Sequence, residues 1–253
     1  MSPSLRMLER SCFSGDLDAA AAAVVKRAMS GKGGFACLAN VHVAMTADRD
    51  DRLRRALASA WEVFPDGAPI AWLRRRTGAT GARRIAGPDL MAAVLEAGRP
   101  AGLRHFLFGS TPAVLEALET RFRERLPDVA IVGRLAPPAG AERSPEYLAD
   151  TASAGSHIVW VALGAPKQEL WAADHAEALV PALIVGVGAA FDFHAGSKHR
   201  APVWVQRTGL EWLHRLVTEP RRLAWRYVST NVRFLVVVGS QLARGAVTGR
   251  TQG

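Results

Sequence analysis

The residues best suited to proton transfer in this sequence lie in short turns that contain glycine or alanine. Asp66 is part of the stretch Phe-Pro-Asp-Gly-Ala-Pro at positions 64–69. Its carboxylate is either an ordinary turn residue or a general base at the edge of a cleft. Asp192 lies among alanine and phenylalanine at positions 188–193. It is either a structural cap or a site residue, because a buried carboxylate must be satisfied by a partner.

Two further turns have the composition of anion-binding sites. Gly109 and Ser110 end an apolar run and precede Thr-Pro, a favourable start for a helix. Gly164 ends another apolar run and precedes Ala-Pro-Lys-Gln, so that Lys167 adds a charge and Gln168 adds polar contacts. The first amide groups of a helix attract anions. Two such turns in one sheet suggest a diphosphate or nucleotide ligand.

Other motifs fail on spacing or context. The glycine-rich run at 30–34 precedes an apolar run instead of following one and lacks the spacing of a phosphate-binding loop, so we expect a turn. The Gly-Val-Gly at 186–188 lacks a third glycine, and we expect no helix to begin there. Asp48 and Asp50 match a metal-binding Asp-x-Asp pattern, but they fall where a helix is expected to begin. The histidines show no metal-ligand spacing, so no metal site is predicted.

The elements that must position these residues alternate between strands and helices. The expected strands are 35–41, 104–108, 129–132, 157–163 and 182–187, and the expected helices are 16–29, 46–61, 112–126, 145–154 and 166–179. This alternation predicts an α/β fold, a Rossmann-like and mostly parallel sheet with helices on both faces. Ligands of such sheets bind at the carboxyl ends of the strands.

The pattern changes near residue 198, where strands cease. We expect a body at 1–197 and a helical C-terminal appendage at 198–253, with helices at 203–216 and 219–242. Ten basic and two acidic residues follow position 197, so the appendage holds most of the net charge of +9. An anionic partner is expected: phospholipid, nucleic acid or a phosphorylated substrate. Trp204, Trp212 and Trp225 suit a membrane interface, or they pack the appendage onto the body.

The remaining composition narrows the class of protein. Apolar residues make up 49% of the chain, enough for a sizeable core. The two cysteines, Cys12 and Cys37, form no paired framework, and the first residues lack the apolar region of a signal peptide. No uncharged apolar run is long enough for a spanning helix. A reduced, cytoplasmic protein is therefore expected.

Several stretches, taken in order, resemble the WecG/TagA/CpsF bacterial glycosyltransferases over roughly residues 35–235. They are FPDGAPIAW, RRIAGPDLM, FLFGSTPAV, VALGAPKQELW, VGVGAAFDFHAG and KHRAPVWVQRTGLEWLHRLVTEPRRLAWRYV, together with the single Asn40. The resemblance implies transfer of a sugar from a UDP-sugar, typically UDP-N-acetylmannosamine, to a polyprenyl diphosphate that carries a first sugar. It also implies inversion of the anomeric centre at the inner membrane face, with no cofactor and no obligatory metal.

The resemblance assigns expected roles to individual residues. Asp66 matches the proposed general base, and Asn40 lines the same pocket. The expected substrate-binding residues of the body are Arg84, Gly109, Ser110, Gly164, Lys167, Gln168 and Asp192. Arg215, Arg222 and Arg226 of the appendage match arginines that face the diphosphate.

Three departures from the family pattern bear on the donor sugar. Leu38 stands where the family usually has threonine, and Pro88 replaces a serine in the Gly-Ser-Asp-Leu motif. Residues 134–138 replace an aromatic segment. Leu38 and Pro88 each remove a hydroxyl, and Pro88 also removes a backbone donor, so these departures bear on the donor sugar more than on the reaction class. The expected donor sugar is of the N-acetylmannosamine type, a hexose or a uronic acid.

Two other classes of function remain as alternatives. A nicotinamide-dependent oxidoreductase would need a glycine fingerprint and a ribose-binding acid, and the sequence has neither. A non-enzymatic protein that binds anionic lipid or nucleic acid would explain the basic appendage but not the polar residues on strand-end loops. The expected partners are thus the UDP-sugar, the lipid-linked acceptor and the membrane surface, with no nucleic acid. Homo-oligomerisation is left open.

Overall fold

The computed structural model describes residues 2–207, 211–218 and 229–240, and within them one six-stranded, all-parallel sheet. The strand order is β2-β1-β6-β5-β3-β4. The strands are β1 (Phe35–Ala39), β2 (Glu62–Pro65), β3 (Arg104–Gly109), β4 (Ala130–Leu135), β5 (Ile158–Ala162) and β6 (Leu183–Gly186). Each neighbouring pair runs parallel, which confirms the predicted α/β, Rossmann-like fold.

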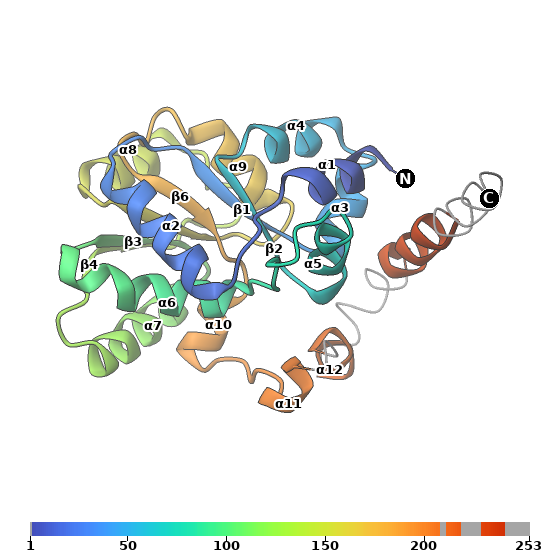
Figure 1. Cartoon of the computed structure of the whole chain (residues 1–253). Coiled ribbons are helices and arrows are strands. Elements are labelled where there is room, and N and C mark those ends of the chain that lie inside the picture. The colour runs from blue at the N-terminus through green and yellow to red at the C-terminus, as the bar shows by residue number, and fades with distance from the viewer. Residues whose placement is uncertain (1, 208–210, 219–228, 241–253) are drawn as a thin grey trace, which may run out of the picture.

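Helices cover both faces of the sheet (Figure 1). One face packs against α2 (Leu17–Met29), α6 (Gly87–Gly98), α7 (Pro112–Arg125) and α10 (Ala190–Ala195). The other face packs against α1 (Pro3–Ser11), α3 (Val41–Ala47), α4 (Asp51–Ser59), α5 (Ala68–Arg75), α8 (Pro145–Ser153) and α9 (Lys167–His175). A short 3₁₀ helix, η1 (Arg99–Ala101), follows α6.

The core consists of two apolar layers separated by the sheet. Along β5, Ile158 and Trp160 point into the layer with α2, α6 and α7, whereas Val159 and Val161 point into the layer with α3 and α9. All four side chains are fully buried. Parallel strands covered on both faces read as continuous apolar runs, because neither set of alternating side chains meets water.

Local sequence explains where the helices begin. Asp16 Oδ1 accepts a hydrogen bond from the Ala19 amide at 2.9 Å and caps α2. The Thr111 hydroxyl accepts from the Val114 amide at 3.3 Å, with proline as the next residue, which confirms the predicted entry into α7. Side-chain oxygens at this position satisfy amides that have no partner within the helix.

Between β1 and α5, one prediction from the sequence was wrong and one strand was missed. The single helix expected at 46–61 is two helices, α3 and α4, because Asp50 turns the chain and accepts hydrogen bonds from the amides of Arg52 and Leu53. The stretch after Trp61 contains β2, which was not predicted. This strand has four residues, lies at the sheet edge and ends in proline, so it lacks a clear strand pattern.

The described part of the chain beyond residue 197, which we call the C-terminal segment, is helical. It contains α11 (Val203–Arg207), α12 (Glu211–Thr218) and a helix at residues 229–240. In Figure 1, α11 and α12 lie below the body and the helix at 229–240, drawn in red, lies to the right of α5. Phe234 and Val238 are buried in the layer that contains α1 and α3. The segment therefore packs on the body, and the division at residue 197 stays a prediction.

Candidate active site

A cleft of about 390 Å³ opens at the carboxyl ends of β1, β2, β5 and β6. Five of the predicted site residues line it: Asn40, Asp66, Arg84, Gly164 and Gln168. The C-terminal segment supplies another part of the wall, through Glu211, Trp212, Asn231, Phe234 and Leu235. Its position agrees with the rule that parallel sheets bind ligands beyond the ends of their strands. Its volume is within the range of small-molecule sites.

Four of the described helices start at this cleft without a side-chain cap. They are α5, α6, α9 and α10. Their first residues or N-caps line the wall at Gly67, Gly87 and Ala189, and Ala165 lines it just before α9. The backbone of Gly87 lies so close to Val187, the residue that follows β6, that a Cβ atom at position 87 would be 2.8 Å from the Val187 carbonyl oxygen. Unpaired amides and the helix dipole make each such N-terminus attractive to anions. These helix starts are therefore the parts of the cleft wall that favour an anionic group, beside the carboxylates of Asp66, Glu169 and Glu211.

Asp66 lies directly after β2, where the chain turns into α5. Its backbone amide donates to the Ala39 carbonyl at 2.9 Å, which fixes it beside the end of β1. Gly67 follows with φ of 111°, a conformation that other residues rarely adopt. The turn therefore presents a carboxylate at the edge of the cleft, which is the geometry expected of a general base.

Asn40 connects Asp66 to the start of α3. Its Oδ1 accepts from the Val43 amide at 3.1 Å and caps the helix, while its Nδ2 donates to Asp66 Oδ2 at 3.4 Å. Because the cap holds the carboxamide in place, the Nδ2 group is fixed toward Asp66. Asn40 thus serves both the fold and the orientation of the carboxylate.

Gln168 and Glu169, in the first turn of α9, are buried polar residues in the cleft wall. Gln168 is 4% exposed and Glu169 is 1% exposed. Gln168 Nε2 donates to Glu169 Oε1 at 3.0 Å, and Gln168 Oε1 is buried with no hydrogen-bond partner among the described residues. A buried acceptor without a partner costs free energy. We interpret the Gln168 carboxamide as a group that is satisfied when a ligand occupies the cleft.

Arg84 is the only arginine or lysine among the described residues that line the cleft. Its Nη2 donates to Glu211 Oε2 on α12. Glu211 also accepts a hydrogen bond from Arg200 Nε at 3.4 Å. Arg200 in turn donates to both carboxylate oxygens of Asp89, with 2.8 Å between Nη2 and Oδ2. Burial alone would lower the pKa of Arg200, but Asp89 and Glu211 outweigh it and raise that pKa above its ordinary value.

Four predicted residues are described but do not line the cleft. Gly109 and Ser110 lie at the end of β3, where the Ser110 amide donates to the Ala162 carbonyl at 3.2 Å. Lys167 lies 3.8 Å from Glu142, with a 68% exposed side chain. Asp192, on α10, lies 3.2 Å from Lys198 Nζ and accepts from the Ser197 hydroxyl. Any contact of these residues with substrate therefore involves a ligand that extends beyond the cleft.

The predicted arginines of the appendage fall largely outside the described residues. Arg222 and Arg226 lie in 219–228, which the structure does not describe, and only the backbone of Arg215 is described, within α12. Their predicted roles stay predictions.

The motifs set aside on sequence grounds take structural roles, with one correction. The glycine-rich run at 30–34 is a turn into β1, as predicted. Asp50 caps α4, and Asp48 accepts from the Ser4 amide at 3.2 Å. The expectation that no helix follows the Gly-Val-Gly at 186–188 was wrong, because α10 begins at Ala190.

The comparison with known families agrees with this geometry. The model of the glycosyl transferase WecG/TagA/CpsF family matches residues 6–247. The chain belongs to this family. The match spans the body and the C-terminal segment, so it includes every residue that lines the cleft. Glycosyl transfer between a sugar donor and an acceptor is therefore the general activity of this WecG/TagA/CpsF glycosyltransferase.

The structure adds cleft residues of the glycosyltransferase to which the sequence analysis gave no role. Glu169 follows Gln168 in the same motif, and Glu211 is one of only two acidic residues in the basic appendage. Their positions in apolar or basic surroundings were a signal, since an isolated acid there needs a partner. Asp89 and Arg200 pair across 111 residues, and nothing in the sequence alone indicates that contact.

Proposed function

We propose that this protein is an inverting glycosyltransferase that moves a sugar from a UDP-sugar to a polyprenyl-diphosphate-linked sugar. The transferred sugar is of the N-acetylmannosamine type, a hexose or a uronic acid, and the product enters cell-surface polysaccharide or teichoic acid synthesis. One observation carries the proposal. Asp66 and Arg84 line the same cleft, at which four uncapped helix N-termini meet. A base and an anion site thus lie together in one small-molecule cleft.

The proposed reaction uses Asp66 to accept a proton. The hydroxyl of the acceptor sugar attacks the anomeric carbon of the donor, its proton moves to the Asp66 carboxylate, and the bond between that carbon and the diphosphate oxygen breaks. UDP leaves from the opposite side, so the anomeric centre inverts. Asn40 holds the carboxylate through Nδ2, which supports this role. Orientation of the two reacting groups provides a further part of the rate enhancement.

Positive charge and helix dipoles stabilise the departing diphosphate in this proposal. Arg84 is at the cleft wall, and α9 begins at Lys167, next to Gly164. The N-termini of α5 and α6 face the same space. Donors that meet charge as it develops on the leaving group lower the barrier of transfer. Arg215, Arg222 and Arg226 are proposed to add charge from the C-terminal segment.

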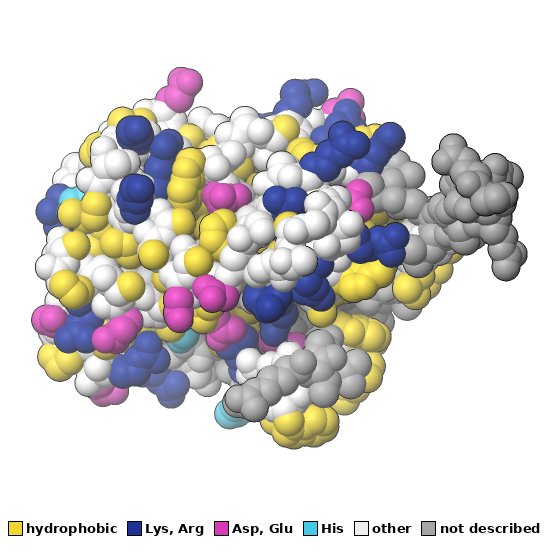
Figure 2. All heavy atoms as spheres, in the orientation of Figure 1, with side chains coloured by type: hydrophobic (Ala, Val, Ile, Leu, Met, Phe, Trp, Pro, Cys, Tyr) yellow, Lys and Arg dark blue, Asp and Glu magenta, His cyan; other side chains and the backbone are white. Residues whose placement is uncertain are grey.

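We further propose that the C-terminal segment contacts the inner face of the plasma membrane, where the acceptor resides. Exposed apolar side chains gather on it, as the yellow groups at the lower right of Figure 2 show. They are Trp204, Trp212, Leu213, Val217, Val232, Leu235 and Val236. Indole rings and arginines are suited to the headgroup region of an anionic leaflet. No helix among the described residues is long and apolar enough to cross a bilayer.

A donor screen tests the proposed function. The full chain is incubated with a panel of UDP-sugars and a synthetic polyprenyl-diphosphate-sugar acceptor, and products are identified by mass spectrometry. We expect one donor to yield an acceptor heavier by one sugar, with the inverted anomeric configuration in nuclear magnetic resonance. Transfer from none of the nucleotide sugars would contradict the proposal. In that case, stabilisation by anionic lipid or oligonucleotide and not by UDP would favour the non-enzymatic alternative.

A further inference from the structure

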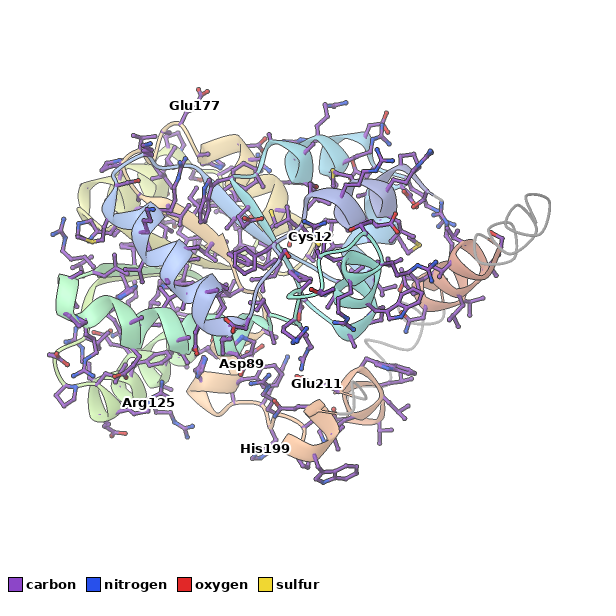
Figure 3. The ribbon with its side chains drawn as sticks, in the orientation of Figure 1. Cys12, Asp89, Arg125, Glu177, His199 and Glu211 are labelled. Carbon is purple, nitrogen blue, oxygen red and sulfur yellow. The ribbon has the colours of Figure 1, made fainter. Side chains whose placement is uncertain are left out.

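Four charged side chains form one chain of contacts between the body and α12. Asp89 on α6 holds Arg200 with both carboxylate oxygens, Arg200 contacts Glu211, and Glu211 accepts from Arg84. Asp89 and Glu211 lie where the C-terminal segment meets the body (Figure 3). The side chains of Arg84, Glu211 and Arg200 are 22%, 11% and 19% exposed, and that of Asp89 is 38% exposed. The contacts of Glu211 are therefore mostly shielded from water, where charge pairing is stronger than at the surface, and the Asp89 end of the chain is more open to solvent.

The geometry leaves Arg84 available to a ligand. Glu211 engages it through Nη2, and a guanidinium carries five N–H donors in a rigid planar fork. Both residues line the cleft, so the contact fixes the guanidinium plane at the cleft wall. Without Glu211, the long side chain of Arg84 would sample several rotamers.

We propose that Glu211 is a positioning residue of the transfer reaction: it docks α12 onto the body and orients Arg84 toward the departing diphosphate. The inference rests on the proposed function, because it needs a diphosphate in the cleft. Arg200, itself held by Asp89, donates to the second carboxylate oxygen of Glu211 and so helps to fix that side chain. Negative charge on the leaving group increases in the transition state, so the alignment of Arg84 affects turnover more than it affects ground-state binding.

The charge balance explains why a carboxylate is tolerated next to an anionic substrate. A lone Glu211 would cancel the charge of Arg84 and repel the diphosphate. Arg200 contacts the other carboxylate oxygen, so Glu211 shares its charge between two guanidinium groups and does not cancel that of Arg84 alone. Asp89 balances Arg200 but does not line the cleft, so its charge lies farther from a ligand bound there. This arrangement favours a positioning role over that of a counter-ion that the substrate displaces.

The first test compares Glu211→Gln with a matched control, Glu119→Gln. Glu119 also bridges two arginines, Arg123 and Arg134, and is 21% exposed, but it lies on α7 away from the cleft. With the nucleotide sugar accepted in the donor screen, beginning with UDP-N-acetylmannosamine, Glu211→Gln should lower kcat at least about tenfold. Its Kd for UDP should stay within about threefold of wild type, and Glu119→Gln should leave both unchanged. Tighter UDP binding of about tenfold with kcat retained would show a displaced counter-ion and overturn the proposal.

A double-mutant cycle separates action through Arg84 from a general structural effect. In an Arg84→Gln background, Glu211→Gln should lower kcat by no more than about twofold, because the residue it positions is absent. If the two losses multiply, Glu211 acts independently of Arg84 and the proposal is wrong. If Glu211 had only a structural role, Glu211→Gln would lower the melting temperature, and its effect on kcat would be the same with and without Arg84.

The proposed docking of α12 onto the body by Glu211 can be tested without substrate. Hydrogen exchange of the α12 amides in the full-length protein should be at least about tenfold faster in Glu211→Gln than in wild type or Glu119→Gln. Equal exchange in all three proteins would overturn the proposal, even if wild type transferred no sugar. Absence of transfer with faster α12 exchange would instead contradict the proposed function and leave the docking role supported.

Discussion

Asn40 Nδ2 donates to Asp66 Oδ2 across 3.4 Å, while Asn40 Oδ1 caps α3 through the Val43 amide. One carboxamide thus connects a helix start to the carboxylate proposed as the base. Because β1 and β2 are neighbouring parallel strands, the residues that follow them meet at the same edge of the sheet.

This relationship predicts the effect of Asn40→Asp on the pH dependence of transfer. The variant keeps an oxygen that can cap α3, but it replaces the Nδ2 donor with a second carboxylate beside Asp66. Neighbouring like charges favour the protonated form of one partner. The acidic limb of the kcat/KM profile should therefore move to higher pH, by about one unit or more. An unmoved limb would mean that the acidic limb does not report Asp66.

Replacement of Gln168 by methionine should separate activity from stability. The variant keeps the volume of the side chain and removes a buried acceptor that has no partner among the described residues. It also removes the hydrogen bond to Glu169. These two effects oppose each other, so the free energy of unfolding should change by less than about 1.5 kcal/mol. The KM for the donor should rise about tenfold or more if the carboxamide contacts it. An unchanged KM would contradict that contact.

His105 makes the fold sensitive to acid. It is buried beside Trp160, whose indole N–H donates to His105 Nδ1 at 3.1 Å. Burial, and to a lesser extent His157, lowers the pKa of His105 to about 3. Between that value and about 6.5, the unfolded chain binds one more proton than the native protein at this residue, so stability falls as pH falls.

The variant His105→Asn tests this linkage, since asparagine keeps an acceptor near the Nδ1 position but does not titrate. From about pH 8 to about pH 5, urea denaturation should show wild type losing about 2 kcal/mol more than the variant. His157 and His194 are present in both proteins, so their contributions cancel in the comparison. If wild type and His105→Asn lost the same free energy of unfolding over this pH range, His105 would be protonated in the native state.

The strands that are buried on both faces of the sheet could be predicted from the sequence, because they form continuous apolar runs. β5 and β6 are apolar runs followed by glycine, and their bounds differ from the expected ones by one residue at each end. β2 was missed because a four-residue edge strand ending in proline has little periodic signal. The place of Gln168 was predictable from the strand that its motif follows, whereas Asp66 was singled out by its Pro-Asp-Gly turn and by the family resemblance. Gly109 and Ser110 also follow a predicted strand but do not line the cleft. The contacts of Arg84 and Asp89 with the C-terminal segment were not, because they depend on how that segment docks.

The exposed apolar side chains of the C-terminal segment predict membrane binding. The triple variant Trp204→Ser, Val217→Ser, Val236→Ser removes side chains that are 68%, 73% and 65% exposed and do not line the cleft. Its partition onto anionic phospholipid vesicles should weaken by about tenfold or more, since each side chain loses apolar burial in the interface.

A matched control for this test changes exposed apolar residues elsewhere. Met29→Ser and Val180→Ser replace side chains that are 44% and 54% exposed and lie outside the C-terminal segment. These variants should sediment with vesicles as wild type does, and all proteins should retain transfer to a short-chain, water-soluble acceptor. Wild-type sedimentation of the triple variant would contradict a membrane role for this surface.

The central claim is that Asp66 is the base of a glycosyl transfer, and the variant Asp66→Asn tests it most directly. Asparagine keeps the shape of the side chain and removes its basicity. Transfer from the UDP-sugar should fall by about 10² to 10⁴, while the Kd for UDP stays within about threefold and the protein remains folded. Folded Asp66→Asn protein that binds UDP and still transfers sugar at a near-wild-type rate would contradict the account.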